Sequence, residues 1–131
     1  MEKTILLVDD EKDIREVLRL PLADLGYQVL EAENGADALH LFERRQPPMM
    51  LTDIKMPGMD GIETLREIKQ THPLVEVIML TGHATVETGI EGMKLGAFDY
   101  LMKPCDIDQL MAKVQEAKTK KTQHEEKITK A

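Results

Sequence analysis

Short aliphatic runs alternate along the chain with longer stretches that mix polar and apolar residues. We expect five strands, at residues 5–8, 27–32, 49–53, 75–80 and 97–102. The first is an unbroken Ile-Leu-Leu-Val, which is typical of a strand buried on both faces. The second contains Gln28 and Glu31, which indicates a strand at a partly exposed edge of the sheet.

The stretches between these runs have the spacing of amphipathic helices. After the first strand, apolar residues recur about once per helical turn, at positions 14, 17, 18, 22 and 25. Gly26 follows at the position of a helix C-cap, and Pro21 inside the pattern predicts a bend. The same apolar spacing returns in the last helix, from Ile107 to Val114.

Polar residues mark the beginnings of three helices. Asn34 is expected to cap the second helix, and Asp60 with Glu63 resembles a capping box for the third. Asp106 with Gln109 fits the same role for the last helix. Five strands alternating with five helices predict an α/β fold with a doubly wound parallel sheet, which fits one domain at 131 residues.

The helix expected between the fourth and fifth strands has a weak sequence. Residues 83–95 include Gly89 and Gly92, which together cost about 2 kcal/mol relative to alanine. One interpretation is a helix that packing stabilises; the other is a marginal element that shifts when a nearby site changes state. We favour the second, because Thr81 lies just before this helix.

Composition and charge narrow the class of protein. A formal net charge of −7 argues against a nucleic-acid-binding surface, and tryptophan is absent, which argues against large stacking platforms. The single cysteine, Cys105, excludes an internal disulfide and fits a reducing compartment. No apolar stretch approaches a membrane span and no signal peptide is visible, so we expect a cytoplasmic protein without membrane contact.

The end of the chain has a different composition. The stretch from Lys118 to Ala131 holds five lysines and two glutamates and has no apolar face of any length. We expect a domain at residues 1–118, followed at 119–131 by a charged tail or the start of a linker. A frayed helix extension or a disordered end fits this tail better than a binding arm.

Polar residues follow four of the predicted strands at the point where each strand ends. These are Asp9, Asp10, Asp53, Thr81 and Lys103. The carboxyl ends of parallel strands lie at one edge of a sheet, and ligands of open α/β sheets bind at that edge. The sequence therefore predicts one site that contains three carboxylates, a hydroxyl and an ammonium group.

Three crowded carboxylates repel one another, and a hard divalent cation with oxygen ligands offsets that repulsion. Mg²⁺ fits this donor set, with Mn²⁺ as a second suitable ion, and the four histidines show no metal-ligand spacing. Asp53 stands alone after a central strand and is the best candidate to attack a phosphoryl group. Lys103 and Thr81 would then bind the phosphoryl oxygens.

Four segments at these positions resemble the response-regulator receiver domain of two-component signalling. They are residues 5–11, 52–61, 79–83 and 96–104, and the resemblance covers about residues 3 to 118. It implies a flavodoxin-like (βα)5 fold with strand order 2-1-3-4-5. It also implies a phosphoacceptor that receives its phosphoryl group from a sensor histidine kinase or a phosphotransfer protein, with self-phosphorylation and slow autodephosphorylation as its only reactions.

The resemblance assigns a role to each residue of the site. It implies that Asp53 is the phosphoacceptor, and that Asp10, Asp53 and the backbone carbonyl of Lys55 hold Mg²⁺. Asp9 would act largely through water, while Thr81 and Lys103 would detect the phosphorylated state. The family also leads us to expect a cis bond between Lys103 and Pro104.

Tyr100 matches the aromatic switch of the family. Phosphorylation would draw Thr81 toward the phosphoryl group and leave room for Tyr100 to turn inward. The face made by the fourth helix, the fifth strand and the fifth helix would then change shape and control an effector, a C-terminal output domain or a phosphorylation-dependent homodimer. Pro21 is unusual in a first helix that often contributes to kinase docking.

Two other classes of function compete with this interpretation. One is a Mg²⁺-dependent phosphatase with an aspartyl nucleophile, which commonly needs an acidic residue two positions after that nucleophile. Lys55 stands at this position and argues against it. The other is an interaction module that works without phosphorylation, which predicts a damaged site, and none of the five strand-end residues is replaced.

Overall fold

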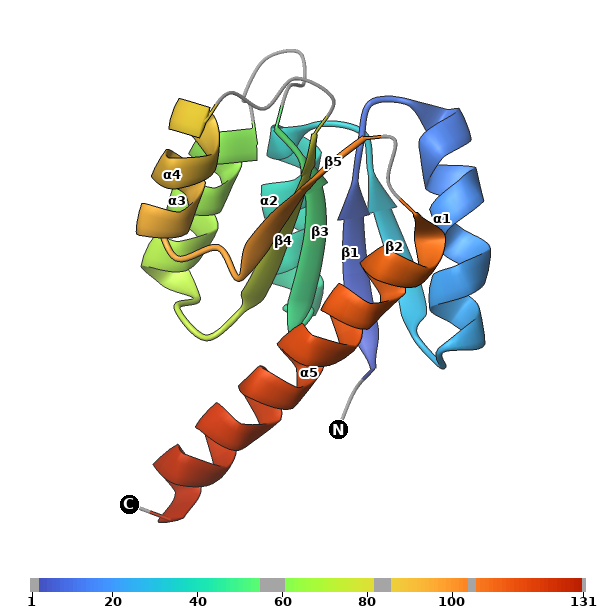
Figure 1. The fold of residues 1–131 in the computed structure, drawn as a ribbon. Helices are drawn as coiled ribbons and strands as arrows, with labels where there is room; N and C mark the ends of the chain where they lie inside the picture. The colour runs from blue at the N-terminus through green and yellow to red at the C-terminus, as the bar shows by residue number, and fades with distance from the viewer. Residues whose placement is uncertain (1–2, 55–60, 82–85, 104–105, 131) are drawn as a thin grey trace.

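The computed structural model describes residues 3–54, 61–81, 86–103 and 106–130, and for residues 81, 86–88 and 121–130 it describes the backbone alone. Strands and helices alternate from beginning to end (Figure 1). The strands are β1 (Thr4–Val8), β2 (Gln28–Ala32), β3 (Met49–Asp53), β4 (Glu76–Thr81) and β5 (Asp99–Met102). The helices are α1 (Lys12–Asp24), α2 (Gly35–Arg45), α3 (Gly61–Thr71), α4 (Val86–Lys94) and α5 (Ile107–Lys130).

All five strands belong to one parallel sheet in the order β2-β1-β3-β4-β5. This confirms the expected flavodoxin-like fold and the place of β2 at an edge. The register sets Val8 opposite Thr52 and Thr81 opposite Met102, so the carboxyl ends of β1, β3, β4 and β5 lie at one edge. The residues that follow these strands therefore meet there.

Each face of the sheet buries its own apolar cluster. Alternate residues of β1 point to opposite faces, so Leu6 packs with the cluster under α2 and α3, and Ile5 packs with the cluster under α1 and α5. Both residues are fully buried. The unbroken aliphatic composition of β1 follows from this burial on two sides.

The helix ends form as their sequences predict. The Asn34 side chain accepts a hydrogen bond of 2.8 Å from the backbone N–H of Asp37, and that of Asp106 accepts one of 2.9 Å from Asp108. Gly26 has a φ of 93°, in the left-handed region that ends α1. Asp60, the predicted cap of α3, lies outside the described residues. Pro21 lies inside α1, which continues as a helix to Asp24.

Two glycines place α4 directly against the sheet. A Cβ atom on Gly89 would stand 2.9 Å from the Tyr100 ring, and one on Gly92 would overlap the terminal methyl of Met79. Side chains at these positions would hold the helix away from the sheet. Tight packing therefore accounts for the glycines that weaken the helix in isolation.

Helix α5 is longer than its apolar pattern predicts. Its backbone stays helical to Lys130, and the last part extends past the lower end of the sheet (Figure 1). The ammonium of Lys120 lies 3.9 Å from the carboxylate of Glu76 and 5.4 Å from the centre of the Phe98 ring. Within the described part of the chain, no helix has both the length and the apolar composition needed to cross a membrane.

Candidate functional site

Three aspartates meet at the carboxyl edge of the sheet. Asp9 and Asp10 directly follow β1, and Asp53 is the last residue of β3. One carboxylate oxygen from each lies within 4.8 Å of the others. Asp9 and Asp53 are buried, whereas Asp10 is exposed, so the cluster opens to solvent on the side of Asp10.

Lys103, which follows β5, reaches into this cluster. Its ammonium nitrogen lies 2.7 Å from Oδ2 of Asp9 and 3.4 Å from Oδ2 of Asp53. The lysine side chain is 16% exposed. The ammonium therefore neutralises part of the charge of both buried carboxylates.

The surroundings of Lys103 favour its charged form. Burial alone would lower the pKa of the ammonium, but the hydrogen bond to Asp9 and the charges of Asp53 and Asp9 outweigh it. The pKa of Lys103 is therefore raised above its ordinary value of 10.5. At neutral pH the site holds a cation that can interact with an arriving anion.

Asp9 is held through its backbone and both carboxylate oxygens. Its Oδ2 accepts from Lys103, and its Oδ1 accepts a hydrogen bond of 2.9 Å from the backbone N–H of Glu11. Its own N–H donates to the carbonyl of Ala32 at 3.1 Å, and its carbonyl accepts a hydrogen bond from the guanidinium of Arg15. Asp9 is therefore fixed by β2, α1 and Lys103 together.

The donor set fits a hard divalent cation. Three carboxylates within 4.8 Å offer oxygen ligands that Mg²⁺ prefers, and exposed Asp10 leaves room for water ligands. In the described part of the chain this is the one group of acidic, histidine or cysteine side chains with such convergence. Lys103 contacts Oδ2 of both Asp9 and Asp53, so an arriving ion would share these two carboxylates with the ammonium, whereas Asp10 adds an exposed carboxylate.

The structure describes two of the remaining predicted residues, Thr81 and Tyr100. The backbone of Thr81 ends β4 beside Met102, at the same edge as the acidic cluster. Tyr100 lies on β5, half-buried, with its ring against α4 at Gly89. Lys55 and Pro104 lie outside the described residues.

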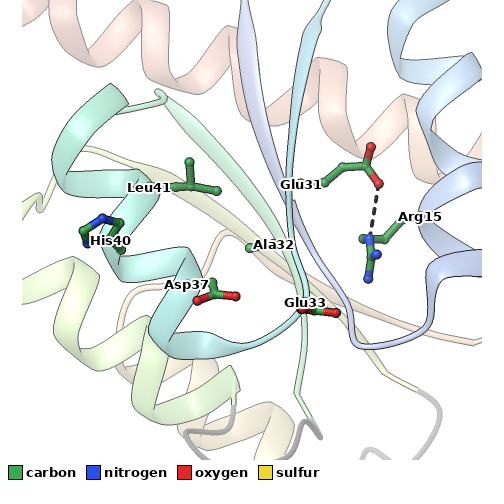
Figure 2. Close-up of a pocket in the computed structure, with 7 residues that line it drawn as sticks. All are labelled: Arg15, Glu31, Ala32, Glu33, Asp37, His40 and Leu41. Carbon is green, nitrogen blue, oxygen red and sulfur yellow. Dashed lines mark hydrogen bonds and ion pairs between the residues drawn. The ribbon is translucent and has the colours of Figure 1, made fainter.

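Sequence analysis missed Arg15. Figure 2 shows its guanidinium turned toward Glu31 of β2, beside a hollow of about 380 Å³ that residues of α1, β2 and α2 line. Its Nε atom lies 3.2 Å from Oε1 of Glu31. A lone arginine one turn into an amphipathic helix carries no signal of its own, because its contacts with the Asp9 carbonyl and with Glu31 form only in the folded chain.

An apolar groove adjoins the site on the opposite side of α1. It has a volume of about 440 Å³ and lies between α1 and the start of α5. Its lining includes Ile14, Val17, Leu80, Lys103 and Ile107. Val17 is 61% exposed, so this groove presents apolar surface right beside the lysine of the site.

The fold and the site define a class of protein: a flavodoxin-like domain of the CheY type with an acidic pocket at the carboxyl edge of its sheet. The family model of the response regulator receiver domain matches residues 5–115, and the chain belongs to this family. It contains the receiver domain of a two-component response regulator. Phosphorylation and Mg²⁺ binding are the known mechanism of these domains.

The relatives include transcriptional regulators. The DNA-binding transcriptional regulator NtrC of Escherichia coli (strain K12) is 43% identical over 113 residues, which are 86% of this chain and 24% of NtrC. The regulatory protein AtoC of the same strain is 45% identical, with the same coverage of 86% and 24%. This chain spans about a quarter of the length of these curated relatives.

Solved structures show the same similarity. The structure of NtrX from Brucella abortus matches with a TM-score of 0.92 at 33% identity, over 100% of this chain and 30% of that one. A CheY-like receiver domain protein from Methanospirillum hungatei JF-1 matches with a TM-score of 0.91 at 31% identity, over 95% of this chain and 99% of that one. The expected family and fold are therefore confirmed.

Proposed function

We propose that Asp53 is the phosphoacceptor of this receiver domain. The observation that carries the proposal is the convergence of Asp9, Asp10 and Asp53 within 4.8 Å, with the Lys103 ammonium against two of them. Asp53 ends a central strand with neighbours on both sides, so its backbone is held at the edge where the three carboxylates meet. A carboxylate in this position can attack phosphorus in line.

Phosphoryl transfer to Asp53 would need only the phosphorylated donor and the carboxylate as reactants. One oxygen of the Asp53 carboxylate forms a bond to phosphorus as the bond between phosphorus and a histidine nitrogen of the kinase breaks. The bonding electrons return to that imidazole, which takes up a proton. With acetyl phosphate as donor, acetate leaves instead, so the domain phosphorylates itself without a kinase.

Asp10, Asp53 and the backbone carbonyl of Lys55 would hold Mg²⁺ or Mn²⁺, with Asp9 acting largely through water. The bound ion would neutralise charge on the transferring phosphoryl group. The Lys103 ammonium would move from the two carboxylates to a phosphoryl oxygen, because the new dianion attracts it more strongly. Thr81, at the end of β4, would donate its hydroxyl hydrogen to another of these oxygens.

The readout would pass from Thr81 to Tyr100 and then to the face formed by α4, β5 and α5. The contact of the Tyr100 ring with α4 at Gly89 supports this route, because a displaced ring changes how the helix sits on the sheet. That face would control an output domain, an effector or a phosphorylation-dependent homodimer. A relative named as a DNA-binding transcriptional regulator supports an output of this type. We expect no direct nucleic-acid contact by the receiver domain itself.

The partner that supplies phosphate would be a sensor histidine kinase or a phosphotransfer protein in the cytoplasm. The apolar groove between α1 and α5 opens beside Lys103, so a helix docked there would bring its histidine to the site. We assign residues 1–118 to the receiver domain and 119–131 to a charged tail or the start of a linker. Slow autodephosphorylation would be the one other reaction of the domain.

Mass spectrometry tests the phosphoacceptor. After incubation with Mg²⁺ and acetyl phosphate, the protein should gain one phosphate, and Asp53→Ala should gain none. Asp24→Ala is the matched control, because Asp24 is an exposed aspartate at the end of α1. Turnover of added phosphoesters would favour a phosphatase, and no adduct together with no turnover would favour an interaction module without phosphorylation.

A further inference from the structure

Arg15 connects the acidic site to the edge strand of the sheet. It lies one turn into α1, and its side chain is only 13% exposed. One guanidinium nitrogen donates to the backbone carbonyl of Asp9, and Nε donates to the carboxylate of Glu31 on β2 at 3.2 Å (Figure 2 shows the pair with Glu31). The planar guanidinium can serve both acceptors at once, which a lysine ammonium on a flexible stem does less well.

The acceptor of this bond belongs to the metal site. The carbonyl of Asp9 is part of the peptide unit that joins Asp9 to Asp10, and a peptide unit is planar. Holding its oxygen therefore fixes the direction in which the chain enters Asp10. The N–H of Asp9 is bonded to Ala32 of the same edge strand, so β2 holds both peptide units that flank Asp9.

In the described structure, the residue that precedes α1 does not cap the helix with its own side chain. Glu11 is the N-cap of α1, and its side chain makes no capping hydrogen bond. The turn between β1 and α1 is instead held by the Asp9 carboxylate, which accepts from the N–H of Glu11, and by Arg15. Loss of Arg15 would remove the hydrogen bond to the Asp9 carbonyl and with it one restraint on the backbone that leads to Asp10.

Arg19 provides an internal comparison. It lies one turn further along α1 and pairs with the same Glu31 carboxylate, also at 3.2 Å. Its side chain is 55% exposed, and Glu31 is its one ion-pair partner in the described part of the chain. Arg15 and Arg19 therefore share an anchor, and they differ in the bond to Asp9.

We propose that Arg15 is a positioning residue that sets the Mg²⁺ affinity of the domain by fixing the Asp9–Asp10 peptide unit, with Glu31 as its anchor. This inference rests on the proposed function, because it takes Asp10 and Asp53 as ligands. Arg15 bonds to the Asp9 carbonyl and to Glu31, so it would act on the ion through the backbone and not as a ligand. Its effect should therefore fall on the occupancy of the metal site, and it should leave the rate of phosphoryl transfer at full occupancy nearly unchanged.

The test titrates the whole chain with MgCl₂ and follows backbone amides of the site by nuclear magnetic resonance. Arg15→Gln should raise the Mg²⁺ dissociation constant about tenfold, the size typical of residues that orient metal ligands. The Mg²⁺ dissociation constant of Arg15→Lys should fall between those of Arg15→Gln and the wild type, and that of Arg19→Gln should match the wild type. Phosphorylation by acetyl phosphate should need more Mg²⁺ in Arg15→Gln and reach nearly the wild-type rate at saturation.

Glu31→Gln keeps the inference testable where Arg15→Gln fails to fold, because it removes the charge of the anchor and leaves Arg15 in place. It should weaken Mg²⁺ binding by a smaller factor than Arg15→Gln. Wild-type affinity in both Arg15→Lys and Glu31→Gln, or an equal loss in Arg19→Gln, would overturn the role of Arg15 and leave the proposed function standing. A wild-type chain that binds no Mg²⁺ would overturn the proposed function itself.

Discussion

The ammonium of Lys103 lies 2.7 Å from the carboxylate of Asp9, although 94 positions separate the two residues. A second carboxylate, that of Asp53, lies 3.4 Å from the same nitrogen. The lysine is thus a cation shared by two buried carboxylates. Binding of a divalent cation and release of this lysine are therefore coupled, because both act on the same negative charge.

The first prediction follows from this shared charge. Lys103→Met should lower the free energy of unfolding by about 2 kcal/mol without Mg²⁺, since it removes a cation that two buried carboxylates share. Added Mg²⁺ should restore more stability to the variant than it adds to the wild type. Urea unfolding with and without Mg²⁺ measures both effects.

Lys113→Met is the matched control for this prediction. Lys113 pairs with Asp99 at 2.9 Å, but the two side chains are 30% and 29% exposed. Surface pairs contribute about 0–1 kcal/mol, so this variant should lose little stability and show no altered response to Mg²⁺. Equal losses in the two variants would contradict a special role for Lys103.

The sequence predicted the fold because its patterns are local. An aliphatic run such as residues 5–8 has few structural alternatives to a strand buried on two sides, and Asn34 and Asp106 mark their helices through contacts a few residues away. The edge site followed from one rule of parallel sheets applied to residues at strand ends. The convergence of the three aspartates with Lys103 agrees with that expectation.

What the sequence did not predict depends on contacts across the fold. The role of Arg15 requires β2 and the carbonyl of Asp9, which no spacing along the chain indicates. Gly89 and Gly92 left open a helix stabilised by packing and a marginal helix that shifts; the structure adds the close contacts with Tyr100 and Met79 that these glycines allow, and the shift stays a prediction. The extension of α5 lacks an apolar stripe, so the sequence does not indicate that Lys120 contacts buried Glu76.

The second prediction concerns Asp10, the exposed aspartate of the acidic cluster. Asp10→Asn should raise the stability of the metal-free protein by about 1 kcal/mol, because it removes one of three carboxylates that repel one another. The same variant should bind Mg²⁺ at least tenfold more weakly. Thermal unfolding and a Mg²⁺ titration give the two results, and a variant that is less stable without metal would count against electrostatic crowding in the site.

The third prediction concerns pH and Tyr27. Burial raises the pKa of the Tyr27 hydroxyl above its ordinary value of 10.0. The unfolded chain releases this proton near pH 10 while the folded chain keeps it, so the folded state binds more protons there and stability falls as pH rises. This stabilisation is fully present below about pH 9 and disappears as pH passes the folded pKa. Tyr27→Phe should therefore lose stability less steeply than the wild type in alkaline urea titrations.

The same variant has a second readout at neutral pH. Among the described residues, the Tyr27 hydroxyl has no hydrogen-bond partner although it is buried. Tyr27→Phe should be as stable as the wild type at pH 7, or more stable by about 1 kcal/mol, because a buried polar group without a partner is costly. A clear loss of stability at pH 7 would mean that the hydroxyl has a partner in solution.

The fourth prediction tests the contact between α4 and Tyr100. Gly89→Ala adds helix propensity of about 1 kcal/mol, but its Cβ atom would stand 2.9 Å from the Tyr100 ring, and overpacking costs about 1–3 kcal/mol. The variant should therefore be less stable than the wild type. In a Tyr100→Leu background the same substitution should increase stability, since the ring is gone.

Tyrosine fluorescence reports the position of this ring. The chain has no tryptophan and two tyrosines, so Tyr27→Phe leaves Tyr100 as the single intrinsic fluorophore of this kind. Gly89→Ala in that background should change the exposure of Tyr100 to a soluble quencher. An unchanged quenching constant, together with an unchanged free energy of unfolding, would show that α4 moves to make room for the Cβ atom. Gly89 would then not be needed to position the Tyr100 ring.

The last prediction concerns the boundary between domain and tail. Ending the chain at Lys118 removes Lys120, whose ammonium lies 3.9 Å from the Oε2 atom of Glu76 and above the Phe98 ring. That oxygen is buried and has no hydrogen-bond partner among the described residues, so the lysine is the group that offsets its charge. A chain of residues 1–118 should be less stable than one of residues 1–122 by about 1 kcal/mol, a modest value because the Lys120 side chain is 59% exposed.

Glu76→Gln should remove most of this difference in urea unfolding, since a neutral amide no longer needs the cation. A difference that persists in Glu76→Gln would place the stabilising effect in the helical backbone beyond Lys118 and not in the ion pair.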